Sequence, residues 1–153
     1  MKVRKSTTRS GRSMSISSSE PSIYDQEYYT YHLELLAAFS AQIQQLPPFN
    51  AEFPNEEDQE FLVALAQLQQ QPQGVSFLEQ GQILMCRIVG TYPHLMPLLY
   101  RDLLWFFGGD CLHYMPDDEI AVFQHLDEKR EEAKQQQAPF SYKEARAKSM
   151  GMH

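Results

Sequence analysis

The sequence predicts an all-α protein: a single-domain bundle of five long helices and one short C-terminal helix, preceded by a disordered N-terminal tail. Three observations support this fold class. Apolar residues recur at three- and four-residue steps in several segments, which is typical of helices with one buried face. Prolines and a pair of glycines separate these segments. No stretch of alternating apolar and polar residues is long enough to predict a strand.

Length and composition narrow the class further. The chain has 153 residues, which favours one domain, and 42 % of them are hydrophobic, which is enough for a packed core. No run of about 18 uncharged apolar residues occurs, so a membrane-spanning helix is excluded. Two cysteines are too few for a disulfide scaffold, and the CxxC and HExxH patterns of common zinc sites are absent.

Residues 1–21 are expected to form a disordered, basic, serine-rich tail, and residues 22–149 the helical domain. The first 19 residues hold nine Ser or Thr and five basic residues, without an acid. They lack the apolar stretch of a secretory signal, and their apolar face is too small to favour an organellar transit peptide. Met14 offers an alternative start of translation. We therefore expect a cytoplasmic protein with reduced thiols.

The first helix is predicted over residues 23–46. Ser22 stands three residues before Asp25, as in a capping box, and the Pro47–Pro48 pair ends the helix. One face of this helix is expected to be buried, because it carries apolar residues and one histidine at helical spacing: Tyr28, His32, Leu35, Leu36, Phe39, Ile43 and Leu46.

The second helix is predicted to begin at Asn55 and to end at the glutamine run before Pro72. Its first turn holds three acids, which the helix dipole favours at that end: Glu56, Glu57 and Asp58. Its buried stripe consists of Phe61, Leu62, Leu65 and Leu68.

The third helix is predicted from Ser76, which forms a capping box with Glu79, to about Val89. Its inward residues are Phe77, Leu84, Met85, Ile88 and Val89. Gly81 lies inside this helix, where glycine costs about 1 kcal/mol relative to alanine, and it predicts a close crossing with another helix.

The last three helices follow prolines and glycines. The fourth starts after Pro93 or Pro97, ends at about Phe107 and is apolar nearly all round, so we expect it at the centre of the bundle. Gly108–Gly109 end it, with the first glycine in the left-handed cap position. The fifth runs from Met115–Pro116 to about Gln137, with Ile120, Phe123 and Leu126 inward, and a capping box of Ser141 and Glu144 opens the short last helix.

The net charge of −7 is unevenly distributed. Residues 1–12 carry five basic residues and no acid, whereas residues 13–127 carry sixteen acids and only Arg87 and Arg101 as cations. Residues 128–153 carry six basic and four acidic residues. An acidic body repels phosphate, so nucleic-acid binding by the folded part is not expected. The basic head is interpreted as a solvated tail, although it could also contact RNA, anionic lipid or the acidic body.

One segment gathers residues that suit a metal or catalytic pocket. Acids, a thiol and imidazoles lie close together around the double glycine, and such ligands suit zinc, manganese or iron. The candidate pocket residues are Arg101, Trp105, Asp110, Cys111, His113, Asp117 and His125.

A structural interpretation of the same segment is favoured over the pocket. Asp110 can cap a turn, Asp117 suits a helix N-terminus, and Cys111 is a small buried hydrophobe. His113 suits a half-buried position. No Glu-x-x-His pair occurs, so the di-iron pattern of ferritin-like bundles is absent. We therefore predict no cofactor, and a metal remains the alternative.

The string RDLLWFFGGDCLHYMPDDEI, with YPHLMPLLYRD before it and FQHLDEKREEA after it, resembles a family of small uncharacterised gammaproteobacterial proteins. The resemblance covers roughly residues 77–132, with a looser match over the first two helices. It implies a soluble bacterial cytoplasmic protein, and it transfers no activity. The basic head to Met14 lies outside the family pattern.

Four tyrosines crowd the first predicted helix: Tyr24, Tyr28, Tyr29 and Tyr31. They can form a partner surface, because aromatic residues are enriched at protein interfaces. They can equally close the bundle with their hydroxyls in water, and this second interpretation is favoured. Arg101 adjoins Asp102 on an apolar helix, which predicts a paired, partly buried guanidinium; the alternative is that it holds an anionic ligand.

We therefore expect a small acidic helical protein that acts as a non-enzymatic interaction or regulatory adaptor for another protein or for its own copy. The Tyr-rich first helix, or a groove beside the fourth, would form the contact. The alternative is a metal- or small-molecule-binding protein, including an enzyme, in which at least three pocket side chains converge. Nucleic-acid binding through the basic head alone is a third, weaker hypothesis.

Overall fold

The computed structural model describes residues 22–149 and is all-α, as predicted. Within these residues no strand occurs, and no helix is long and apolar enough to cross a membrane. The expected disordered tail of residues 1–21 lies outside the described residues. The elements, in chain order, are α1 (Ile23–Ile43), α2 (Glu56–Gln70), α3 (Gly74–Thr91), η2 (Pro93–Leu98), α4 (Arg101–Phe107), η3 (Gly109–Tyr114), α5 (Asp117–Gln136) and α6 (Tyr142–Ser149), where η marks a 3₁₀ segment.

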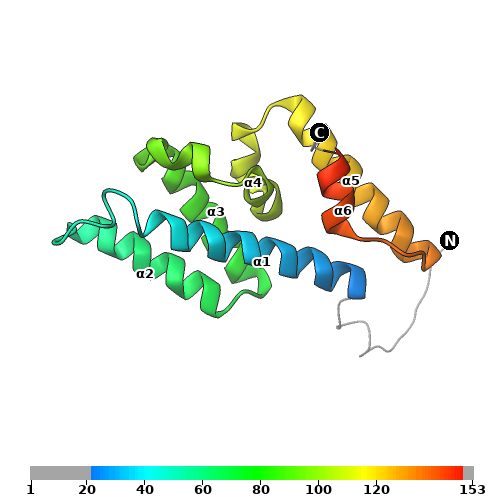
Figure 1. The fold of residues 1–153 in the computed structure, drawn as a ribbon, viewed down its shortest axis with the longest axis horizontal. Helices are drawn as coiled ribbons and strands as arrows, with labels where there is room; N and C mark the ends of the chain where they lie inside the picture. The colour runs from blue at the N-terminus through cyan, green and yellow to red at the C-terminus, as the bar shows by residue number, and fades with distance from the viewer. Residues whose placement is uncertain (1–21, 150–153) are drawn as a thin grey trace.

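Helix α1 forms the long axis of the molecule, and α2 runs antiparallel beside it (Figure 1). The short α4 packs against α1 and also contacts α3, η3 and α5. Helices α5 and α6 pack together at the N-terminal end of α1. The predicted central position of the fourth helix is confirmed, since Leu103 and Leu104 at its centre are fully buried.

Three of the predicted helix starts are confirmed by side-chain hydrogen bonds. The Ser22 hydroxyl accepts from the Asp25 amide at 3.1 Å, and the Asn55 side chain accepts from the Asp58 amide at 2.8 Å. The last helix is capped in the same way by Ser141. Each cap satisfies an amide that has no partner inside the helix.

The predicted close crossing at Gly81 is also confirmed. A Cβ atom added to Gly81 would lie 2.1 Å from Cε1 of Phe107. The buried Phe107 ring therefore occupies the space that any other residue at position 81 would fill. This contact brings α4 directly onto α3.

Three local predictions are wrong. Ser76 caps nothing, because α3 already begins at Gly74 and no side chain caps it. The fourth helix is only seven residues long, since Pro97 lies in the separate segment η2 and Leu99 has extended backbone. Gly108 has a positive φ of 70°, but its ψ of −149° lies outside the left-handed helical region.

Two aromatic clusters fill the core. At the C-terminal end of α1, the rings of Phe49, Phe61 and Tyr92 lie 4.9–5.5 Å apart between centroids. At the other end, His32 and Phe106 stack at 4.7 Å with an interplanar angle of 6°. The first cluster joins the segment after α1 to α2 and to the junction of α3 and η2, and the second joins α1 to α4.

Candidate functional site

The residues of the predicted metal or catalytic pocket do not converge. Four of them are exposed to solvent: Asp110, His113, Asp117 and His125. The His125 ring lies 3.9 Å from the Glu128 carboxylate on the same helix. Within residues 22–149, no group of three or more histidine, cysteine or acidic side chains is arranged to hold a metal ion. The condition set for the pocket hypothesis is therefore not met in this part of the chain.

Two further members of that predicted pocket have structural partners. The Nε of Arg101 donates to the Glu119 carboxylate at 2.8 Å, and its Nη2 donates to the Tyr114 carbonyl at 2.8 Å. The indole Nε1 of Trp105 donates to the Asp127 carboxylate at 2.9 Å. Arg101 is paired and partly buried, as expected, but its partner is not the adjacent Asp102.

Asp102 instead binds Arg146 of α6. The two residues form a bidentate pair with N–O distances of 2.7 and 2.9 Å, and the Asp102 side chain is 1 % exposed. Hydrogen bonding to this carboxylate raises the pKa of Arg146. The pair holds α6 against α4 and leaves neither charge free for a ligand.

The four tyrosines of α1 pack against the protein. The Tyr28 ring contacts Tyr142 edge-on at 5.0 Å and carries the Arg130 guanidinium over its face at 4.0 Å. Tyr29 and Tyr31 are half-buried against aromatic neighbours, and the Tyr24 hydroxyl donates to the Ala138 carbonyl at 2.8 Å. These contacts favour the bundle-closing interpretation over a tyrosine partner surface.

His32 is fully buried in this aromatic cluster. Its Nδ1 lies 2.7 Å from the Tyr28 carbonyl, which can only accept, so Nδ1 carries the proton. Its Nε2 is buried without a hydrogen-bond partner, as is the Tyr142 hydroxyl. Burial lowers the pKa of His32 to about 4, so the ring is neutral at pH 7. With no exposed surface, it has no path to a substrate.

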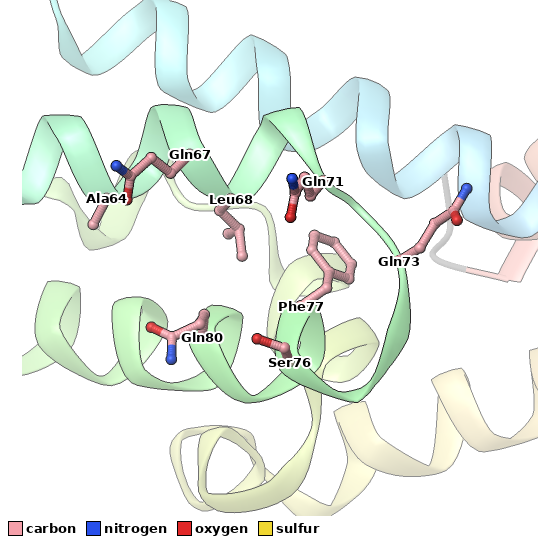
Figure 2. Close-up of a pocket in the computed structure, with 8 residues that line it drawn as sticks. All are labelled: Ala64, Gln67, Leu68, Gln71, Gln73, Ser76, Phe77 and Gln80. Atoms are coloured by element: carbon pink, nitrogen blue, oxygen red, sulfur yellow. The ribbon is translucent and has the colours of Figure 1, made fainter.

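An open groove lies between the end of α2 and the start of α3 (Figure 2). Leu68 of α2 and Phe77 of α3 point into the space between the two helices and form its floor. Polar side chains surround this floor, and all of them are exposed: Gln67, Gln71, Gln73, Ser76 and Gln80.

The chemistry of this groove differs from that of the groove between α5 and α6. None of its lining residues is charged. The groove between α5 and α6, in contrast, is lined by Lys129, Glu132, Glu144 and Lys148. The four glutamine amides make no hydrogen bond to any residue in the described range 22–149, so their donors and acceptors are available to a ligand.

The groove was not predicted from the sequence. The glutamine run at Gln69–Gln71 indicated only a helix end. A usable signal was present, since Gln67 and Gln71 stand four residues apart and lie on one face of a helix. What the spacing could not show is that Gln80 of the next helix faces the same space.

Comparison with known proteins gives one match. The family model described as PA2817-like matches residues 24–153. This match confirms the predicted resemblance to an uncharacterised family and extends it well beyond residues 77–132. No curated protein and no solved structure matches the chain significantly.

Proposed function

The chain belongs to the PA2817-like family, and we propose that it is a non-enzymatic interaction protein that holds a segment of a partner protein in the α2–α3 groove. The observation that carries this proposal is the set of four unpaired amides around an uncharged, apolar floor. A primary amide both donates and accepts, so it complements the N–H and C=O groups of a peptide backbone. A partner's apolar side chain would rest on the small exposed parts of Leu68 and Phe77, which are 5 % and 3 % exposed.

The size of the groove favours a polypeptide over a small molecule. Its volume is about 260 Å³ and it is open to solvent. Sites that enclose drug-sized ligands usually measure about 300–1,000 Å³ and bury most of the ligand. A groove of this size takes one or two side chains of a longer segment, which continues across the surface on either side.

The lack of charged residues in the groove also limits which partners can bind there. A nucleic acid or a strongly acidic ligand needs cations at its binding site, and this groove has none. We infer that the bound segment is uncharged where it enters the groove and carries one apolar side chain. Contact through the tyrosines of α1, the surface first expected, has less support because those rings are used inside the bundle.

Site-specific photo-cross-linking tests this proposal. A benzophenone amino acid replaces Ser76 at the groove, or Gln135 on the exposed face of α5 as the matched control. We expect a discrete cross-linked protein from position 76 in the source cells, and none from position 135. Gln80→Glu should abolish this product, because it introduces a charge at the groove without reaching the core.

Two results would count against the proposal. Equal cross-linking from positions 76 and 135 would show that the groove is not selective. A product that persists unchanged with Gln80→Glu and Gln67→Glu would show that the amides are not used. A product made of two identical chains would replace the heterologous partner with a second copy.

A further inference from the structure

The only two cysteines of the chain lie together in the fold. Cys86 is on α3 and Cys111 is on η3, and these two elements pack against each other. The Sγ of Cys111 lies 3.8 Å from the carbonyl oxygen of Gln82, one helical turn before Cys86. The two thiols are near enough for the Cys86 thiol to raise the pKa of Cys111. The packing of η3 on α3 thus places two cysteines that are 25 positions apart in the sequence beside each other.

The surrounding backbone holds this contact in place. A Cβ atom on Gly109 would lie 2.7 Å from the Gln82 side chain, so the glycine allows η3 to approach α3 closely. The Gln82 amide in turn donates to the Phe107 carbonyl at 2.8 Å. Gln82 therefore binds both Phe107, before the double glycine, and Cys111, after it. These two contacts hold Cys111 near Cys86.

The two thiols differ in accessibility. Cys111 is fully buried, whereas Cys86 is half-buried and lies near Tyr114, a residue that is 38 % exposed. Burial, and then the neighbouring Cys86 thiol, raise the pKa of Cys111 to about 12. A small oxidant therefore reaches the Cys86 thiol before the Cys111 thiol, because Cys86 is the more exposed of the two. Cys111 remains a protonated thiol beside it.

We propose that Cys86 and Cys111 are a redox-modification site, in which a peroxide converts the two thiols to a reversible intramolecular disulfide that ties η3 to α3. This inference is independent of the α2–α3 groove, to which neither cysteine contributes. Both cysteines are free thiols in the structure, and a disulfide that forms only on oxidation is typical of redox-sensing sites.

The chemistry takes two steps. Cys86 first loses its proton, and the thiolate sulfur attacks one peroxide oxygen. The O–O bond breaks, Cys86 becomes a sulfenic acid, and the other oxygen leaves as hydroxide, which takes up the released proton to become water. The Cys111 sulfur then attacks the Cys86 sulfur, the S–O bond breaks, and the hydroxide leaves as water with the proton of Cys111. In total, the two thiols lose two electrons and two protons, and one molecule of hydrogen peroxide is reduced to two molecules of water.

Intact mass spectrometry of the full-length, fully reduced protein tests the inference. After treatment with hydrogen peroxide and alkylation of remaining thiols, we expect an unalkylated monomer that has lost about 2 Da, and dithiothreitol should restore two alkylatable thiols. Trypsin cleaves after Arg87 and Arg101, which separates the two cysteines, so a peptide pair joined by a disulfide would assign the bond.

Single-cysteine variants separate the two roles. Cys111→Ala should leave a sulfenic acid on Cys86 that dimedone captures, and Cys86→Ser should leave Cys111 unmodified. Because Cys111→Ala changes a buried residue and could disturb the fold, the inference is judged on the mass and the peptide map of the wild-type protein. Three wild-type results would overturn the inference: two thiols that stay alkylatable, a gain of about 32 Da as sulfinic acid without a disulfide, or disulfide-linked dimers.

Discussion

Acidification should destabilise this protein through His32, and the effect can be isolated with one substitution. The ring is 0 % exposed and stacks on Phe106. Its pKa is lowered from 6.5 to about 4, and burial is the largest cause; the Tyr28 carbonyl and Asp102 act in the opposite direction, and Arg130 and Arg146 add smaller lowering effects. Protonation would place a second N–H at Nε2, which has no hydrogen-bond partner.

The direction of the pH effect on stability follows from the number of protons that His32 binds in the folded and in the unfolded chain. Above pH 6.5, His32 is neutral in both the folded and the unfolded chain, so it makes no pH-dependent contribution. Below pH 6.5 the unfolded chain binds a proton that the folded chain refuses until about pH 4. The free energy of unfolding therefore falls by about 1.4 kcal/mol per pH unit, or by about 2 kcal/mol at pH 5.

His32→Phe removes the titrating group and keeps a ring against Phe106. The Tyr28 carbonyl keeps its helical hydrogen bond, so we expect the variant to be within about 1 kcal/mol of wild type at pH 7. Urea unfolding at pH 7 and pH 5, followed by helix circular dichroism and by fluorescence of the single tryptophan, measures both proteins. The wild type should lose about 2 kcal/mol more than the variant between these conditions. Equal losses, with unchanged slopes against urea, would refute the argument.

Two further predictions concern packing and charge, and both are measured as the free energy of unfolding in urea. Gly81→Ala should lower it by about 1–3 kcal/mol, because the new Cβ collides with the buried Phe107 ring, whereas Gly90→Ala, with no atom within 4 Å, should raise it by up to about 1 kcal/mol. Equal effects would contradict the close crossing. Arg146→Met should lower it by about 3–5 kcal/mol, because the Asp102 carboxylate is left buried and unpaired. Adding Asp102→Asn should recover part of this loss, and no recovery would show that the buried charge is not the cause.

The helix starts and the fold class could be predicted because their causes are local. Ser22, Asn55 and Ser141 each accept a hydrogen bond from an amide three residues ahead, and that spacing is visible in the sequence. Gly81 was interpretable for a related reason, since a costly residue inside a helix calls for a packing explanation. Such signals require no knowledge of which elements meet.

The errors arise where a second element decides the outcome. Ser76 matched the capping pattern, yet Gly74, with a φ of 90°, starts the helix two residues earlier. Arg101 was assigned to its sequence neighbour Asp102, but consecutive helical residues point in different directions. Each of the two found a partner on another helix: Arg101 on α5 and Asp102 on α6.

The functional hypotheses show the same limit more sharply. The segment Asp110–Cys111–Leu112–His113 suggested a pocket because its reactive side chains are close in sequence, but a 3₁₀ segment sends Asp110 and His113 to solvent and Cys111 inward. The buried Cys111 thiol lies beside Cys86. The sequence did not predict a site at Cys86, because no reactive side chain stands near it in the sequence. Residues that are close in sequence can suggest a site even when their side chains point in different directions. Sequence proximity also misses a site whose residues come from different elements. The cysteine pair and the glutamine-lined groove are both of the second kind, and each rests on how α3 meets its neighbours.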